Sequence, residues 1–581
     1  MWKEWSQKRK LWTVFVGSCL FLEIFFVLRA FLGFNTADEM YFAGTMERVF
    51  RGERILIDEW NPTQQLNVFT IYPVYVLLRN ILGSTEGIIL GIRISSLVLH
   101  LVIAGIAFEK IWKKGWSALA GTLLFLSYAP FGIFTLSYNS IQFSVLFLLL
   151  ACLYGKTEHR GGEYILYGIL LAVLVLANPF GIFLYGGYGL LCLLAAVWGR
   201  KENRQITEIL KLRSFLLVTM GAALVAALFA AFIFSRGSLE EILANLPHIV
   251  GDAEHQQGLR AYVDKTFRYF YLCYKNYKYM VWCFVALYLA LFLDKNRKSH
   301  ELIYMGLGVV SCGWYLIYYG FMFGHIPVNY QMLPLSFLGL EAYILTREKD
   351  RRLFYCWYLP AIFFTMLVQY ATNTGIVTIS AAYSISTISS VLMLGDYGRE
   401  VWNNQGGSWK PRAVLGLLFL AMSLQFAGTL YLRMTFAWGD DKTWKLDTPM
   451  ERGPLKGVYT TAEQAREYEQ VLAELDMLCL NSEDQLLVVG VAPWIYLYTE
   501  AGCGSYSTWQ VHENSTQLYA YYELHPDKFP TVIYMMHWGE EFMASSLARP
   551  FLEKAGYEVW YLERGIVMQA PERAQSITPA G

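Results

Sequence analysis

The sequence predicts a polytopic α-helical membrane protein with about thirteen transmembrane helices and a C-terminal extracytoplasmic α/β domain. Hydrophobic residues make up 55% of the 581 residues and charged residues 16%, whereas soluble proteins carry about 25% charged residues. Long apolar runs recur from Leu11 to Leu432, and the residues after them have the composition of a soluble domain. The formal net charge is zero, and nothing in the composition indicates a nucleic-acid partner.

The chain begins with a basic segment, Met1 to Lys10. The apolar run that follows is longer than the core of a signal peptide, about 7–15 residues, and it lacks a small-residue cleavage site. We therefore expect a retained first helix with its N-terminus in the cytoplasm.

Lysines and arginines alternate between successive connections of the predicted helices. The predicted spans are 11–32, 87–108, 116–134, 139–155, 163–178, 180–199, 212–235, 278–294, 301–323, 329–345, 353–370, 375–394 and 413–432. Basic residues fill the connections 109–115, 155–163, 199–213, 294–301, 346–352 and 398–412. The intervening short turns contain neither lysine nor arginine. This pattern follows the positive-inside rule, and an odd number of spans places the C-terminus outside the plasma membrane.

One apolar segment does not fit this count. Counting Leu66 to Leu82 as a span would put every later basic connection outside. We therefore expect a juxtamembrane helix there, broken near Pro73. The first extracytoplasmic loop then covers 33–86, and a second long one covers 236–277.

Residues 435–581 follow the transmembrane domain, 1–434, and alternate strand-like with helix-like segments. Three segments have the pattern of strands: 484–493, 531–539 and 558–569. Two have the pattern of helices: 515–527 and 545–557. We expect a small α/β domain without a phosphate-binding loop. The nine cysteines show no CxxC motif, which argues against a thiolate zinc site; Cys479 and Cys503 could pair in an oxidising compartment.

The first loop opens with an acidic pair, Asp38-Glu39, followed by apolar residues at helical spacing, which predicts a helix at the membrane surface. Thr36 and Glu39 fit a capping box, with Asp38 in a first turn that favours negative charge. The same position suits catalysis, because a carboxylate at the mouth of a helical bundle can accept a proton from an acceptor hydroxyl. The helix dipole would keep Asp38 ionised, as a base must be.

Other candidates lie in the external regions. A second acidic pair, Asp58-Glu59, precedes a predicted turn, where Asp commonly caps. Glu254 and His255 lie in the second long loop. Arg260, Lys265 and Arg268 follow them among aromatic residues, where they either snorkel at the interface or bind a lipid phosphate. His325 and Tyr330 occupy a short external turn, where tyrosine is often only an anchor.

This arrangement resembles the GT-C superfamily, glycosyltransferases that use polyprenyl-phosphate-linked sugars, and in particular the protein O-mannosyltransferases and the lipid A aminoarabinose transferase. The layout is similar over the transmembrane two-thirds. In those families the acidic residue of the first loop is the catalytic carboxylate, which Asp38 matches in "ADEMYFAG". The protein mannosyltransferases carry Asp followed by Glu, as Asp38-Glu39 does.

Two further stretches carry the resemblance. "GDAEHQQGLR" is similar to a Glu-His element after the seventh helix, with Glu254, His255 and, more loosely, Arg260. "VNYQMLPLSFLGL" is similar to an Arg-Tyr-x-Leu-Pro stretch, with Tyr330 and Pro334.

The chain departs from the family where cations are expected. The end of the first loop, "QQLNVFTIYP", lacks the usual basic residue and pair of prolines, and Asn329 replaces the Arg of the Arg-Tyr pair. Both missing cations would face the donor phosphate. Arg260, Lys265 and Arg268 are the candidates to replace them.

The resemblance implies an inverting glycosyltransferase that moves a sugar from a polyprenyl-phosphate donor to an extracytoplasmic lipid, glycan or protein hydroxyl. Asp38 would be the base and Glu39 its orienting partner or helix cap. Asp58 or Glu59 would bind sugar hydroxyls, and His255 with Arg260 or Lys265 would face the phosphate. One base and a departing phosphate imply inversion at the anomeric carbon.

Membrane lipids are expected partners. The sequence indicates no cofactor, and it leaves open whether the protein uses a divalent metal. A transporter or flippase is the main alternative; it would favour midplane charges or inverted repeats. A polysaccharide polymerase or ligase with a diphosphate-linked donor is a third class.

Overall fold

A computed structural model of the chain describes residues 2–35, 37–156, 158–198, 209–250, 258–294, 299–314, 325–371, 375–403, 409–509, 515–536 and 556–574. Within these residues, seven helical segments are long and apolar enough to cross a membrane. They are α1 (Trp2–Ala30), α4 (Ile88–Ile111), α6 (Tyr138–Gly155), α8 (Ile182–Trp198), α10 (Leu212–Phe234), α15 to α16 (Arg351–Tyr370) and α19 (Trp409–Thr435). The bent helix α12 (Leu259–Leu293) would be an eighth. The chain is a multi-pass membrane protein, as predicted, and the number thirteen stays a prediction.

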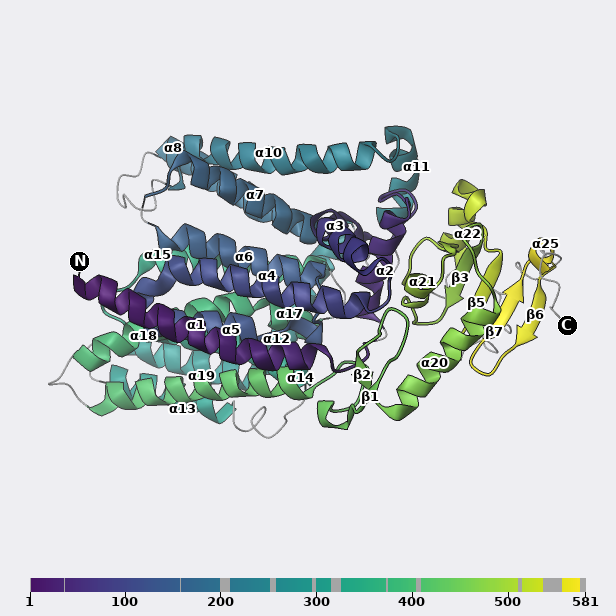
Figure 1. The fold of residues 1–581 in the computed structure, drawn as a ribbon. Helices are drawn as coiled ribbons and strands as arrows, with labels where there is room; N and C mark the ends of the chain where they lie inside the picture. Colours follow the sequence, from purple (N-terminus) through teal and green to yellow (C-terminus); the bar gives the residue numbers. More distant parts are fainter. Residues whose placement is uncertain are drawn as a thin grey trace.

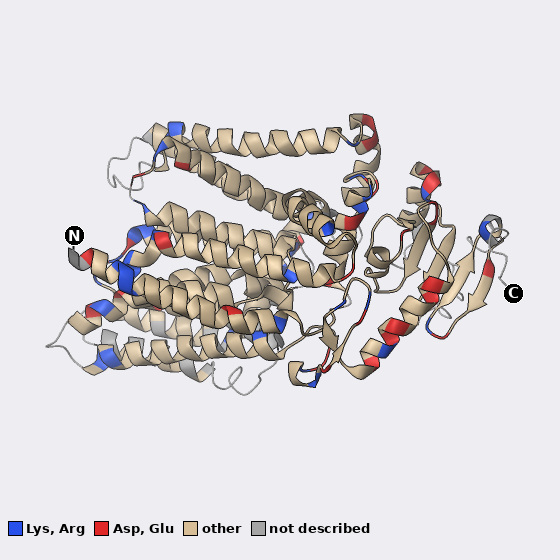
Figure 2. Ribbon diagram, in the orientation of Figure 1, with Lys and Arg blue, Asp and Glu red and all other residues tan. Residues whose placement is uncertain are grey.

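Six further helices cover the other predicted spans: α5 (Trp116–Ser127), α7 (Gly161–Ala177), α13 (His300–Trp314), α14 (His325–Leu345), α17 (Ile376–Ala382) and α18 (Ser384–Asn403). Figure 1 shows the long helices side by side in one bundle. Lysines and arginines gather at the end of the bundle that carries the N-terminus (Figure 2), as the predicted topology requires.

Helices α7 and α10 approach each other closely through glycine. A Cβ added at Gly168 would clash with the backbone carbonyl of Val218, and one at Gly221 with that of Ile165. Small residues at such contacts let membrane helices pack backbone against backbone.

The first loop folds into α2 (Asp38–Phe50) and α3 (Pro62–Leu82). The predicted helix at α2 is confirmed, but its place at a membrane surface was wrong, because every residue from Glu39 to Val49 is buried. Helices α3, α4 and α21 (Ile495–Tyr498) enclose it. α3 continues through Pro73, so the predicted break was also wrong. It lies crosswise to the bundle (Figure 1).

The C-terminal residues form a five-stranded sheet of order β4-β3-β5-β7-β6. The strands are β3 (Gln485–Val489), β4 (Gly502–Cys503), β5 (Val532–Met535), β6 (Glu558–Tyr561) and β7 (Ile566–Gln569). The strands β4, β3 and β5 are parallel, whereas β7 is antiparallel to β5 and β6. The segment 558–569 is therefore a hairpin and not the single strand that was predicted.

Helices α20 (Ala462–Met477) and α22 (Ser515–Leu524) accompany the sheet. Most of the predicted helix 545–557 lies outside the described residues. Cys479 and Cys503, which could have paired in an oxidising compartment, are both free. One hydrophobic core runs from the bundle through α2 into β3 and β5, so the first loop is packed between them.

Candidate active site

Asp38 is the first residue of α2, and its half-buried carboxylate forms no hydrogen bond or ion pair with any described residue. Burial, and to a smaller extent the charge of Glu39, raises the pKa of Asp38 to about 6. Desolvation therefore outweighs the helix dipole that the sequence suggested as the dominant influence. The carboxylate is mostly ionised at neutral pH, and its higher basicity suits a general base.

Glu39 does not cap α2, because the N-cap residue is Ala37 and no side chain caps the helix. Thr36 lies outside the described residues. The Glu39 carboxylate forms an ion pair with Arg93 and accepts a hydrogen bond from the backbone N–H of Phe134 at 2.7 Å. Both side chains are buried, Glu39 at 0% and Arg93 at 2% exposure.

Arg93 also holds the end of α1. Its guanidinium donates to the carbonyl oxygens of Ala30 and Gly33, each at 2.8 Å. The Glu39–Arg93 pair therefore fixes the first turn of α2, and with it the backbone of Asp38, against two other segments of the bundle. Removing one partner of such a pair leaves a buried charge uncompensated, at a cost of about 3–5 kcal/mol.

Two more buried arginines stabilise the same end of the bundle. Arg29 donates to the carbonyls of Arg433 at 2.9 Å and Phe436 at 2.5 Å, and its guanidinium lies 4.5 Å from the Phe134 ring centroid. The Arg433 guanidinium lies 3.8 Å from the ring centroid of Phe26. Sequence reasoning missed Arg93 and Arg433, although a charge within or beside an apolar span is a rare and informative signal.

A series of polar contacts leads away from Asp38 along the ends of the helices. The Asp38 carboxylate interacts electrostatically with Tyr138, the first residue of α6. The Gln142 amide donates to Asn139 at 2.9 Å, and Asn178 donates to Gln142 at 3.1 Å. These contacts join the start of α6 to the end of α7.

The series continues through aromatic rings to α12. Phe180 packs against Tyr262 at 5.6 Å and Tyr370 at 5.8 Å between ring centroids. The buried Lys265 ammonium donates to the carbonyl of Tyr370 at 2.9 Å. Arg268 is exposed one turn further along α12. Of the three predicted phosphate-binding cations, Lys265 is thus buried against Tyr370, whereas Arg268 and, at the start of α12, Arg260 are exposed.

Asp58 and Glu59 have structural partners. Asp58 accepts hydrogen bonds from the Arg54 backbone N–H at 2.7 Å and guanidinium at 3.0 Å, and Glu59 accepts from Arg48 at 2.7 Å. Burial raises the pKa of Glu59 to about 7. Arg48 also donates to the carbonyl of Ser505 at 3.2 Å. Both carboxylates are thus buried and paired with arginines of the first loop, and Arg48 in turn links that loop to the C-terminal domain. Their role as sugar ligands stays a prediction.

Trp60 completes that link. Its backbone N–H donates to the carbonyl of Tyr506 at 2.8 Å, and its indole N–H donates to Asn245 at 2.8 Å. Its ring stacks on His248 with 4.5 Å between centroids. The first loop, α11 (Leu239–Val250) and the C-terminal sheet therefore meet at one buried tryptophan.

The remaining candidates are not placed. Glu254 and His255 lie outside the described residues. His325 and Tyr330 belong to the first two turns of α14, but their side chains are outside the described part. Among the described residues, no group of three or more His, Cys, Asp or Glu side chains could hold a metal ion.

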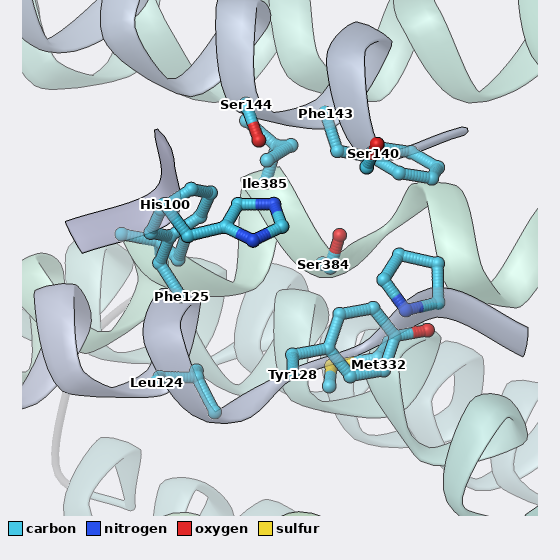
Figure 3. A pocket seen from close by; sticks show the side chains of 12 residues that line it. His100, Leu124, Phe125, Tyr128, Ser140, Phe143, Ser144, Met332, Ser384 and Ile385 are labelled. Carbon is cyan, nitrogen blue, oxygen red and sulfur yellow. The ribbon is translucent and has the colours of Figure 1, made fainter. Parts of the chain in front are cut away.

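A cavity of about 20 Å³ lies inside the bundle, beside His100. Figure 3 shows the His100 imidazole with the hydroxyls of Ser144 and Ser384 around the same space; these two hydroxyls have no partner among the described residues. A volume of this size holds about one water molecule, so it is too small for a sugar or a phosphate.

Comparisons with protein-family models and with curated proteins find no match. Among solved structures, the archaeal oligosaccharyltransferase AglB from Archaeoglobus fulgidus, in complex with an inhibitory peptide and a dolichol-phosphate, is similar at 13% identity and a TM-score of 0.45, over 99% of this chain and 76% of that one. ArnT from Cupriavidus metallidurans bound to undecaprenyl phosphate is similar at 10% identity and a TM-score of 0.46, over 96% of this chain and 97% of that one. Both alignments extend over nearly the whole of this chain.

Proposed function

We propose that the chain is an inverting membrane glycosyltransferase that transfers a sugar from a polyprenyl-phosphate-linked donor to a hydroxyl acceptor outside the cell, with Asp38 as the general base. The observation that carries this proposal is the unpaired, half-buried Asp38 carboxylate, whose pKa burial raises to about 6. The sequence resemblance of the first loop to the GT-C superfamily supports the same residue.

The reaction is a single displacement. Asp38 accepts the proton of the acceptor hydroxyl while the acceptor oxygen attacks the anomeric carbon. The bond from that carbon to the phosphate oxygen breaks, and the electron pair leaves with the polyprenyl phosphate. Lys265, whose ammonium lies against the carbonyl of Tyr370, and Arg268, one turn further along α12, would stabilise the charge that develops on the phosphate. Attack opposite to the leaving group inverts the anomeric configuration.

The acceptor would approach from the C-terminal domain. Trp509 packs against Tyr41 of α2 at 5.1 Å between ring centroids, and the Thr508 hydroxyl lies 3.4 Å from that of Thr45. The sheet domain therefore reaches α2 within two turns of Asp38, where it would bound the acceptor side of the site.

The test compares Asp38→Asn with a control variant, Asp447→Asn. Asp447 is an exposed aspartate of the C-terminal domain. Purified protein is supplied with polyprenyl-phosphate-linked mannose or aminoarabinose, or with the lipid-linked sugar that co-purifies with it, together with a cell-envelope extract as the source of acceptor hydroxyls, and release of polyprenyl phosphate is measured. We expect Asp38→Asn to lose about 10²–10⁴ in rate and Asp447→Asn to keep full activity. Full activity in Asp38→Asn would remove the base, and a protein that moves the lipid but never releases the phosphate would be a carrier.

A further inference from the structure

A large groove lies at the opposite end of the bundle from Asp38. It has a volume of about 1360 Å³ and runs between α5, α18 and α19. Its walls are mainly apolar and include Leu119, Leu123, Val391, Leu415 and Phe419. Phe419 is 65% exposed, so the groove opens at the outer surface of the bundle, where lipid would surround the protein.

The groove has the length of a lipid chain. Along α19 its lining extends from Arg412 to Phe426, which corresponds to about 20 Å at 1.5 Å per residue. The hydrocarbon core of a bilayer is about 30 Å thick. A Cβ added at Gly416, inside this stretch, would meet nothing within 4 Å, so the middle of the groove is open space.

One end of the groove is basic. Lys113, Arg399 and Arg412 line it together with Lys114, and no acidic residue is in the described lining. Lys114 is paired with Asp350 and Asp396, Arg399 with Asp396, and the exposed Lys113 lies 3.6 Å from Glu4. Arg412 is exposed and forms no ion pair with a described residue.

Two tryptophans mark the same end as an interface. Trp116 is 60% exposed and Trp402 81% exposed, and both line the groove. Exposed tryptophans of membrane proteins concentrate at the level of the lipid headgroups. The cations beside them therefore lie where a phospholipid phosphate would be.

We propose that this groove binds one anionic phospholipid from the leaflet at the N-terminal end of the bundle. Its phosphate contacts Arg412, Arg399 and Lys113, and one acyl chain lies along α19 past Gly416. On the predicted topology this is the cytoplasmic leaflet. The proposal is independent of the proposed transferase activity, because the groove and Asp38 lie at opposite ends of the bundle.

The test is native mass spectrometry of the full-length protein in mild detergent, titrated with phosphatidylglycerol or with phosphatidylcholine of the same chains. We expect retention of one phosphatidylglycerol in preference to phosphatidylcholine. The double variant Arg399→Gln/Arg412→Gln should weaken this retention about tenfold, since each basic side chain near a headgroup adds to the attraction. Arg347→Gln, an exposed cation of the same end outside the groove, should not change it.

Gly416→Phe tests the chain rather than the headgroup. Its side chain would occupy the open stretch, so it should reduce retention of both lipids, while thermal unfolding without added lipid stays unchanged. Equal retention of the two lipids by the native protein, or retention of phosphatidylglycerol unaffected by the double variant, would overturn the proposal and leave only general contact with the bilayer. If Gly416→Phe fails to fold, the retention of phosphatidylglycerol by Arg399→Gln/Arg412→Gln still tests the proposal.

Discussion

Asp38 and Glu39 are neighbours in the sequence, yet Glu39 is paired with Arg93 whereas Asp38 has no partner among the described residues. The Arg93 charge is thus compensated by Glu39 and does not stabilise the ionised form of Asp38. Burial, with a smaller contribution from the Glu39 charge, therefore raises the pKa of Asp38 without an opposing cation. On the proposed function, Glu39 positions the helix and Asp38 is the base.

Activity is expected to depend on pH through Asp38. Because the base must be ionised, and burial raises the pKa of Asp38 to about 6, kcat/KM should fall as pH falls through about 6 and reach a plateau above 7. The measurement is the rate of polyprenyl phosphate release between pH 5 and 8. A profile that stays flat down to pH 5 would contradict the assignment.

Stability is expected to change in the opposite sense when Asp38 is neutralised. The pKa of Asp38 is higher in the folded chain than in the unfolded one. Asp38 therefore contributes fully to the free energy of unfolding below pH 4, where it is protonated in both states. This contribution is lost as pH rises through 6. Asp38→Asn should therefore be more stable than the native protein at pH 8, by about 1–3 kcal/mol, and no more stable at pH 4. Thermal unfolding in detergent at the two pH values measures the difference.

The Glu39–Arg93 pair is expected to behave as a unit. Glu39→Gln and Arg93→Met should each lower the free energy of unfolding by about 3–5 kcal/mol, because each leaves one buried charge alone. The double variant should lose much less than the sum of the two. Strictly additive losses would show that the two side chains do not interact.

Lys265 is expected to act on the donor. Lys265→Gln should raise KM for the polyprenyl-phosphate sugar and lower kcat/KM by about tenfold or more, because a charge near the phosphate is lost. Lys275→Gln, an exposed lysine of the same helix, is the control. Equal kinetics for the two variants would remove Lys265 from the site.

The contact between α7 and α10 is expected to tolerate nothing larger than glycine. Gly221→Leu should destabilise the bundle by about 3 kcal/mol or more, because its side chain meets the Ile165 backbone, which cannot move aside. Gly187→Leu on α8, where a Cβ meets nothing within 4 Å, should fold normally. The yield of monodisperse protein in detergent separates the two.

The helices of the bundle could be predicted from the sequence because each is a local apolar run. The surroundings of α2 could not, since they come from residues far along the chain: Arg48 contacts Ser505, and Trp60 contacts Tyr506. Asp58 and Glu59 are paired within the same loop, with Arg54 and Arg48, and their role as sugar ligands stays a prediction. The hairpin in 558–569 was read as one strand, although Gly565 lies at its turn.

The link between the first loop and the C-terminal sheet also sets an order of events during biosynthesis. Arg48 and Ser505 are 457 residues apart, and at about 5–20 residues per second a ribosome needs roughly half a minute to a minute and a half to make the intervening chain. During that interval Arg48 and Trp60 of the nascent loop lack their partners in the C-terminal domain, Ser505 and Tyr506. The C-terminal end of α2, which carries Arg48, and the loop after it can therefore take their final position only after translation of the sheet.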